Sequence, residues 1–225
     1  MSLRVIATLL SLPAPLFAAG LQGSLQTQWQ SQYISEGRDN LDGSSLYSVG
    51  GDLVMADIAA GVWQAWEAGG DYRENTLYAE YAPYFGEWNP YLNVSYLQFH
   101  PQDPDDVEVG IGVSRRLTTL IRLALDSTWS KQASGRFYAL SAIAETPLWE
   151  TVIVDLRLTQ TYDDGYASEA YDGLNNLEAG LQFTWNAIEG LSFYAGWQHS
   201  WAGEDVRRDG GQDESWGQIG VMGYF

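Results

Sequence analysis

The sequence is most informative at first for what it lacks. It contains no cysteine, which excludes a disulfide framework and thiolate chemistry. Basic residues are few, with 11 Lys and Arg against 29 Asp and Glu, and the formal net charge is -18. A protein that wraps nucleic acid needs clustered Lys and Arg, so we expect no nucleic-acid partner. Beyond residue 20 the chain has no apolar run long enough to form a transmembrane helix.

The one continuous apolar stretch lies at the amino terminus. Arg4 precedes the apolar residues 5–17, and small residues follow. This order is typical of a secretory signal peptide, which we expect over residues 1–19. A membrane anchor is the alternative, but the stretch is short and Pro13 and Pro15 would break it as a helix.

The rest of the chain has a regular alternation of apolar and polar residues. In "LQTQWQSQYI", residues 25–34, four glutamines lie two residues apart on one face. Leu25, Thr27, Trp29 and the residues that continue this spacing lie on the opposite face. In "TLIRLALDSTW", Leu123 and Leu125 alternate with polar or small residues in the same way. A period of two residues indicates strands with one apolar face, because successive side chains of a strand point to opposite sides.

Twelve such segments can be counted over residues 20–225, each about ten residues long, which is the length of a tilted strand across a bilayer. Their centres lie near residues 29, 50, 62, 79, 94, 110, 123, 140, 156, 181, 196 and 220. Short and long connections alternate between them, as in bacterial outer-membrane barrels. The sequence therefore predicts an all-β fold, a single 12-stranded antiparallel transmembrane β-barrel in the bacterial outer membrane.

Aromatic residues, 14% of the chain, gather near the ends of these segments, as in the two interfacial girdles of a membrane barrel. Outer-membrane lipid and lipopolysaccharide are therefore expected partners. A secreted β-sandwich would also alternate apolar and polar residues. It is disfavoured because nearly every predicted strand would then expose an apolar outward face, and because aromatics would not bracket the strand ends.

The chain ends in "IGVMGYF", which we interpret as a last strand that closes on the first. Ends of this kind resemble those of outer-membrane proteins that carry a signal for the barrel-assembly machinery. The resemblance implies an assembly signal at Tyr224 and Phe225 and makes that machinery a partner during biogenesis. The position two before the end, usually bulky and apolar, is here Gly223.

The stretch "SQYISEGRDN" is similar to the opening strand of the TorF family of small exported porins, which tend to begin Ser-x-Tyr-(Ile/Val)-x-x-Gly. The matching residues are Ser31, Tyr33, Ile34 and Gly37. The family often has Arg directly before that glycine, where this chain has Glu36 and places Arg38 after it. The resemblance implies a passive, porin-like role.

Enzymatic and metal chemistry find little support in the sequence. Of the two histidines, His199 is followed by Ser200, but adjacent strand residues point to opposite faces, and His100 precedes a proline. There is no Gly-x-Ser-x-Gly elbow, and the acidic stretches "DPDD" and "DDGYASEAYD" lack the spacing of a calcium-binding loop. We therefore expect no enzyme activity, no catalytic residue, no metal site and no cofactor.

The polar faces of the predicted strands supply the candidate lining of a pore. These residues are Gln28, Gln30, Gln32, Asp52, Glu80, Glu108, Arg122, Asp126, Asp155, Arg157, Glu178 and Gln182. Charged side chains at this depth in the membrane are tolerated only in contact with water or as oppositely charged pairs. Arg122 and Arg157 lie two strands apart, with the small inward residues Ala139 and Ser141 expected between them, and inward glycines such as Gly112 and Gly220 favour open space.

Two functions remain open at this stage, and a third, a lipid-modifying enzyme such as a hydrolase with Ser activated by His, is disfavoured because the required arrangement is missing. The first is a channel for passive diffusion of small polar solutes that prefers cations, because carboxylates outnumber arginines on the inward face. The second is a non-conducting barrel, filled by these ions, that acts through its acidic outer loops as an adhesin, receptor or envelope structural protein. Eight-stranded barrels are filled and 16-stranded ones are open, so a count of twelve does not decide between the two.

Overall fold

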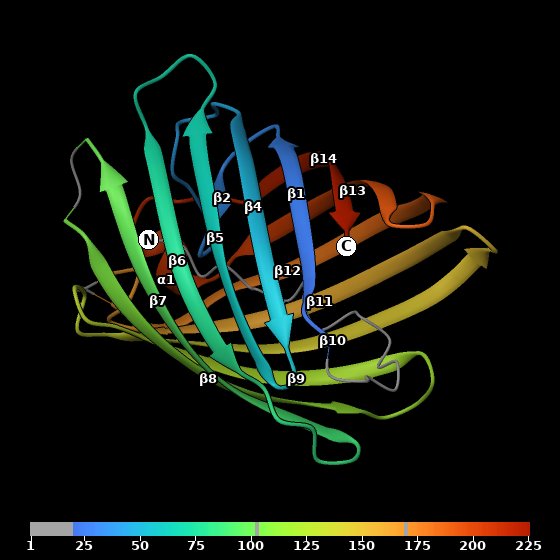
Figure 1. The fold of residues 1–225 in the computed structure, drawn as a ribbon. Helices are drawn as coiled ribbons and strands as arrows, with labels where there is room; N and C mark the ends of the chain where they lie inside the picture. Colours follow the sequence, from blue (N-terminus) through green and yellow to red (C-terminus); the bar gives the residue numbers. More distant parts are fainter. Residues whose placement is uncertain (1–19, 102–103, 169–170) are drawn as a thin grey trace.

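The computed structural model describes residues 20–101, 104–168 and 171–225, so the predicted signal peptide, residues 1–19, lies outside the described residues. Twelve of the described strands form one closed antiparallel barrel (Figure 1). They are β1 (Gln22–Gln30), β4 (Leu46–Met55), β5 (Ile58–Glu67), β6 (Arg73–Tyr81), β7 (Trp88–His100), β8 (Asp106–Arg116), β9 (Ile121–Ser130), β10 (Arg136–Trp149), β11 (Val152–Asp164), β12 (Asp172–Ile188), β13 (Leu191–Ala202) and β14 (Glu214–Tyr224). The predicted fold class is confirmed, and a sandwich of two sheets is excluded.

The barrel closes between its first and last strands, which lie side by side in Figure 1. The pairing runs from Ser24 opposite Tyr224 to Gln30 opposite Gln218. One residue further, the backbones of Gly23 and Phe225 exchange two hydrogen bonds, of 2.8 and 3.0 Å. The ring of Phe225 lies against Gly23, where a Cβ would clash with it. The last strand therefore removes both sheet edges, as predicted, while the assembly signal at Tyr224 and Phe225 stays a prediction.

The outside of the barrel is apolar and exposed. Leu125 in β9 and Leu140 in β10 lie directly opposite each other on this face and are 54% and 55% exposed. Large apolar side chains of the other strands are exposed in the same way, among them Leu53, Val62, Leu77, Val94, Ile111, Leu156, Phe183 and Ile219. An exposed apolar surface that encircles a closed barrel is what lipid tails cover. No helix of the described residues is long and apolar enough to cross a membrane.

The two ends of the barrel differ in their connections. At one end lie the short turns, such as residues 56–57, 150–151 and 189–190, where Gly190 supplies the positive φ of 76° that a tight turn requires. At the other end lie longer loops, including residues 31–45, 165–168 and 203–213. The end with the longer loops corresponds to the outer side of bacterial barrels, and we call it the outer mouth.

The first predicted strand is corrected by the structure. Alternation continues to Ile34, but β1 ends at Gln30, because the chain there leaves the barrel wall. Residues 31–45 fold into a loop that contains a two-stranded hairpin, β2 (Ile34–Ser35) and β3 (Arg38–Asp39). A short helix, α1 (Glu204–Arg208), lies in the loop before β14.

Candidate functional site: the lumen and its outer mouth

The strand register shows which residues face the lumen, because residues directly opposite each other in antiparallel strands share a face. Asp52 in β4 lies opposite Ser24 in β1, and the Ser24 hydroxyl donates a hydrogen bond of 3.0 Å to Asp52 Oδ2. Asp52 also lies opposite Gly61, on the face away from the exposed leucines.

Eleven of the twelve predicted lining residues lie on barrel strands, on this inward face. They are Gln28, Gln30, Asp52, Glu80, Glu108, Arg122, Asp126, Asp155, Arg157, Glu178 and Gln182. The twelfth, Gln32, lies beyond the end of β1, in the loop of residues 31–45, where its Nε2 is 3.4 Å from Asp39 Oδ2. Gln32 is therefore not part of a strand face, and the function of the other eleven in lining a pore remains a prediction.

Glutamine side chains on four neighbouring strands join in one network on the inward face. Gln28 and Gln198 each donate to Gln218 Oε1, over 2.8 and 2.9 Å. Gln218 in turn donates over 2.9 Å to Gln182 Oε1. Gln218 was not identified from the sequence, because the network becomes visible only when β1 and β14 are known to be adjacent. This part of the wall is polar and uncharged.

The two inward arginines are arranged differently from the expectation. Arg122 in β9 and Arg157 in β11 both lie opposite Ile143 in β10. The small residues expected between them lie elsewhere in the register, since Ala139 pairs with Asp126 and Ser141 with Ala124. An apolar side chain therefore separates the arginines, and each lies within the electrostatic influence of carboxylates, including Asp155 for both.

The inward glycines do not all leave open space. The ring of Tyr91 covers Gly112, so that a Cβ on Gly112 would lie 2.8 Å from Tyr91 Cζ and 2.5 Å from Asp126 Oδ1. Tyr194 covers Gly220 and Tyr78 covers Gly61 in the same way. The expectation that inward glycines mean open space is therefore wrong at Gly112 and Gly220, because rings of neighbouring strands occupy that space.

The loop of residues 31–45, which we call the crossing loop, contacts two opposite walls of the outer mouth. The Tyr33 hydroxyl donates over 3.0 Å to Glu74 Oε2 in β6. Asn175 Nδ2 in β12 donates over 2.8 Å to the Glu36 carbonyl oxygen. In the order of strands, β12 is six steps from β6 in either direction around the barrel. A segment that contacts both strands crosses the mouth.

Beside the hydrogen bond from Asn175 to Glu36, one arginine makes three further side-chain contacts at the far side of the crossing loop. Arg38 donates to Asp205 Oδ2 over 2.8 Å, to Asp209 Oδ2 over 3.0 Å and to Asn175 Oδ1 over 2.8 Å. We call these four residues the latch. Burial opposes the charged form of Arg38, but its hydrogen bonds to Asp205 and Asp209 outweigh burial and raise the pKa of the guanidinium. Arg38 is therefore charged at physiological pH. Sequence reasoning missed it, since its members lie up to 171 residues apart.

The loop before β12 also closes onto the mouth. The Tyr166 hydroxyl donates a short hydrogen bond to Glu108 Oε1, and the Tyr166 ring lies 5.6 Å from that of Phe137. Burial, reinforced by the Glu108 carboxylate, raises the pKa of Tyr166 well above its ordinary value. Tyr166 therefore stays protonated and remains a donor. Asp163 fixes the loop by accepting from the backbone N–H groups of Tyr166 and Ser168, both over 2.9 Å.

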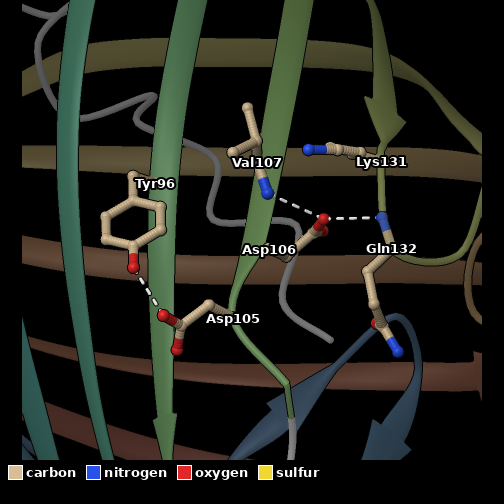
Figure 2. Close-up of a pocket in the computed structure, with 6 residues that line it drawn as sticks. All are labelled: Tyr96, Asp105, Asp106, Val107, Lys131 and Gln132. Carbon is tan, nitrogen blue, oxygen red and sulfur yellow. Dashed lines mark hydrogen bonds between the residues drawn. The ribbon is translucent and has the colours of Figure 1, made fainter.

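A pocket lies at the rim of the mouth, between β7, β8 and the end of β9 (Figure 2). Its carboxylate Asp106 accepts from the backbone N–H groups of Val107 and Gln132 and from the Ser130 hydroxyl, each over 2.7 Å. Asp105, beside it, accepts a hydrogen bond from Tyr96. Asp106 therefore joins the start of β8 to the residues at and after the end of β9.

His199 has a serine partner that the sequence did not reveal. His199 Nδ1 lies 2.6 Å from Ser215 Oγ, on the directly opposite position of β14. The imidazole ring lies between the rings of Trp197 and Trp201, at 5.9 and 4.4 Å. No carboxylate hydrogen-bonds to His199 among the described residues, so the orienting third group of a hydrolase is not present there. In the described part of the chain no group of three or more His, Asp or Glu is arranged to hold a metal ion.

Comparison with known proteins shows the fold. No family model matches the sequence, and a search of curated proteins finds no relative. The structure is similar to the KdgM porin, with a TM-score of 0.65 and 11% identity, covering 90% of this chain and 99% of the porin. It is also similar to the NanC porin, with a TM-score of 0.60 and 9% identity, covering 89% and 98%.

A third similar structure is an outer membrane channel from Pseudomonas putida F1, with a TM-score of 0.58, 11% identity and coverage of 94% and 97%. A further KdgM structure, with a TM-score of 0.62, 9% identity and coverage of 91% and 99%, is described as a complex with disordered oligogalacturonate. The chain therefore has the 12-stranded fold of small outer-membrane channels. The resemblance to the TorF family stays a prediction.

Proposed function

We propose that this protein is an outer-membrane channel through which small polar solutes diffuse passively, with a preference for cations. The observation that carries the proposal is the charged inward face of a closed barrel whose outer face is apolar. Charged side chains at membrane depth require water or close partners. Three lining carboxylates accept hydrogen bonds from hydroxyl groups, Asp52 from Ser24, Glu108 from Tyr166 and Asp126 from Tyr91. Water in the lumen would stabilise the charges of the inward face further.

The negative charge of the inward-facing side chains supports the proposed cation preference. The inward strand positions carry the carboxylates Asp52, Glu80, Glu108, Asp126, Asp155 and Glu178 against the arginines Arg122 and Arg157. A narrow passage of one sign concentrates ions of the opposite sign. The similar KdgM structure is described as a complex with disordered oligogalacturonate, and this description concerns that protein alone.

Reversal potentials in a planar bilayer under a salt gradient test the proposal. Cation preference is expected at low salt and should fade near 1 M, where the Debye length falls to ~3 Å. Anion preference in the intact protein, converting to cation preference in Arg122→Gln/Arg157→Gln, would instead mean that the arginines set selectivity. The expected preference for cations would then be wrong.

The crossing loop favours a second candidate, a barrel that does not conduct and acts through its acidic outer loops as an adhesin, receptor or envelope structural protein. In this case the crossing loop and the charged side chains of the inward face fill the interior of the barrel. Absence of any conductance from protein that shows the heat-dependent gel shift of a folded barrel, both in the wild type and after deletion of residues 32–44, would favour this candidate over the channel.

A further inference from the structure

The two attachments of the crossing loop differ in kind. At the β6 side, Tyr33 packs into an apolar cluster with Leu46 and Ala65, against which Leu41, Trp63 and Tyr72 also pack. This attachment is a small hydrophobic core next to the point where the loop rejoins the wall. At the β12 side the attachment is polar and depends on the latch of Arg38, Asp205, Asp209 and Asn175. The loop is therefore firmly anchored at one side of the mouth and held by charge at the other.

The tip of the crossing loop, at Gly37, packs closely against Asn176 in β12 and Val206 in α1, and we call this surface the seat of the loop. Gly37, with a φ of 73°, approaches β12 and α1 so closely that a Cβ there would lie 2.9 Å from Asn176 Cβ and 3.2 Å from Val206 Cγ2. Val206 itself is fully buried beneath this contact. The seat is thus shaped for a residue without a side chain, and movement of the tip would expose Val206.

The latch is built so that its contacts are lost together. One guanidinium makes all three side-chain contacts, to β12, to α1 and to the residue that follows α1. The Asp205 side chain is 0% exposed, whereas that of Asp209 is 38% exposed. The second oxygen of Asp205, Oδ1, is buried without a hydrogen-bond partner among the described residues. Without Arg38, Asp205 would be an uncompensated buried charge, which favours separation of the loop from its seat.

We propose that the crossing loop is a gate over the outer mouth, anchored at Tyr33 and closed by the Arg38 latch. This inference rests on the proposed channel function and adds its regulation. When Arg38 leaves Asp205 and Asp209, the tip lifts from β12 and α1 while the Tyr33 cluster remains in place. Solutes then enter through the space that the tip occupied. Charge-assisted hydrogen bonds of this type are strong, so the closed state dominates in the wild type.

The test compares Arg38→Gln with the wild type and with Arg115→Gln. Arg115 is the matched control, because it forms a single exposed ion pair with Glu87, 3.1 Å long, beside a short turn at the opposite end of the barrel. In single-channel recordings, Arg38→Gln should raise the ratio of open to closed time about tenfold, which corresponds to about 1.4 kcal/mol. Arg115→Gln should leave this ratio unchanged.

A second measurement follows the gate without relying on current. Because the chain contains no cysteine, Val206→Cys introduces one thiol beneath the loop tip. A water-soluble thiol reagent added from outside should label it slowly in an otherwise wild-type background and about tenfold faster together with Arg38→Gln, the same population shift. If Val206→Cys does not fold, the recordings of Arg38→Gln decide the question alone.

The two proposals fail differently. Faster labelling without current in any variant leaves the gate standing and overturns the channel. Current that is the same in the wild type and in Arg38→Gln, with equal labelling rates, overturns the gate and leaves the channel standing.

Discussion

The Tyr91 ring in β7 lies against Gly112 in β8, and its hydroxyl donates a hydrogen bond of 2.7 Å to Asp126 Oδ1 in β9. The absence of a side chain at Gly112 gives the ring a place against the barrel wall, since a Cβ there would lie 2.8 Å from Tyr91 Cζ. The hydrogen bond between Tyr91 and Asp126 thus links β7 to β9 across β8 on the inward face. Tyr91 also fixes the position of one of the carboxylates that we assign to the lumen.

The first prediction concerns this contact. Gly112→Ala should destabilise the barrel by roughly 1–3 kcal/mol, the usual cost of overpacking, because the Tyr91 ring must leave its position. Gly110→Ala is the control, since it lies on the same face of the same strand and its Cβ would meet no atom closer than 3.6 Å. Unfolding of both variants by urea in lipid vesicles measures the difference. Equal stability of the two variants would mean that the ring is not held by Gly112.

The second prediction concerns the lipid-facing side. Leu123→Arg should cost roughly 2–4 kcal/mol, because it places a charge among lipid tails near the bilayer midplane. Ala124→Arg, on the inward face of the same strand, should be tolerated if the lumen is wet. The same unfolding experiment compares them. Equal damage from both substitutions would contradict the assignment of faces or the proposed aqueous lumen.

The third prediction concerns closure of the barrel. Deletion of Phe225, or Phe225→Asp, should block insertion into the outer membrane and leave export intact, because this residue extends the closing pair with Gly23. Phe225→Tyr keeps the backbone pair and an aromatic ring and should insert normally. Membrane fractionation and the shift on heating in a gel report the outcome. Normal insertion of the truncated chain would show that the terminal residue is dispensable.

The fourth prediction concerns ion preference. Asp52→Asn/Glu80→Gln removes two carboxylates from the inward face and should reduce the cation preference measured by reversal potential. Glu87→Gln is the control, because Glu87 lies in an exposed turn and its side chain is 69% exposed. The effect should shrink at high salt, where exposed charges are screened. An unchanged reversal potential in the double variant would assign selectivity to other residues.

The strands could be read from the sequence because their cause is local. In β9, Leu123 and Leu125 alternate with Arg122, Ala124 and Asp126, and the same period recurs twelve times. A strand that separates lipid from a polar interior must alternate, so the pattern and the fold have the same origin. The closing of the last strand on the first followed from the same argument, since an open edge is not tolerated in lipid.

The inside of the barrel and its outer mouth were decided only by the tertiary structure. The alternation through Tyr33 and Ile34 continues past Gln30, and nothing local marks the point at which the chain leaves the wall to cross the mouth. The position of Ile143 between Arg122 and Arg157 depends on register. The contact of Arg38 with Asp205 joins residues 167 apart. Period-two patterning fixes which face of a strand a residue occupies, but closure of the ring and packing of the loops fix which residues of other strands it meets.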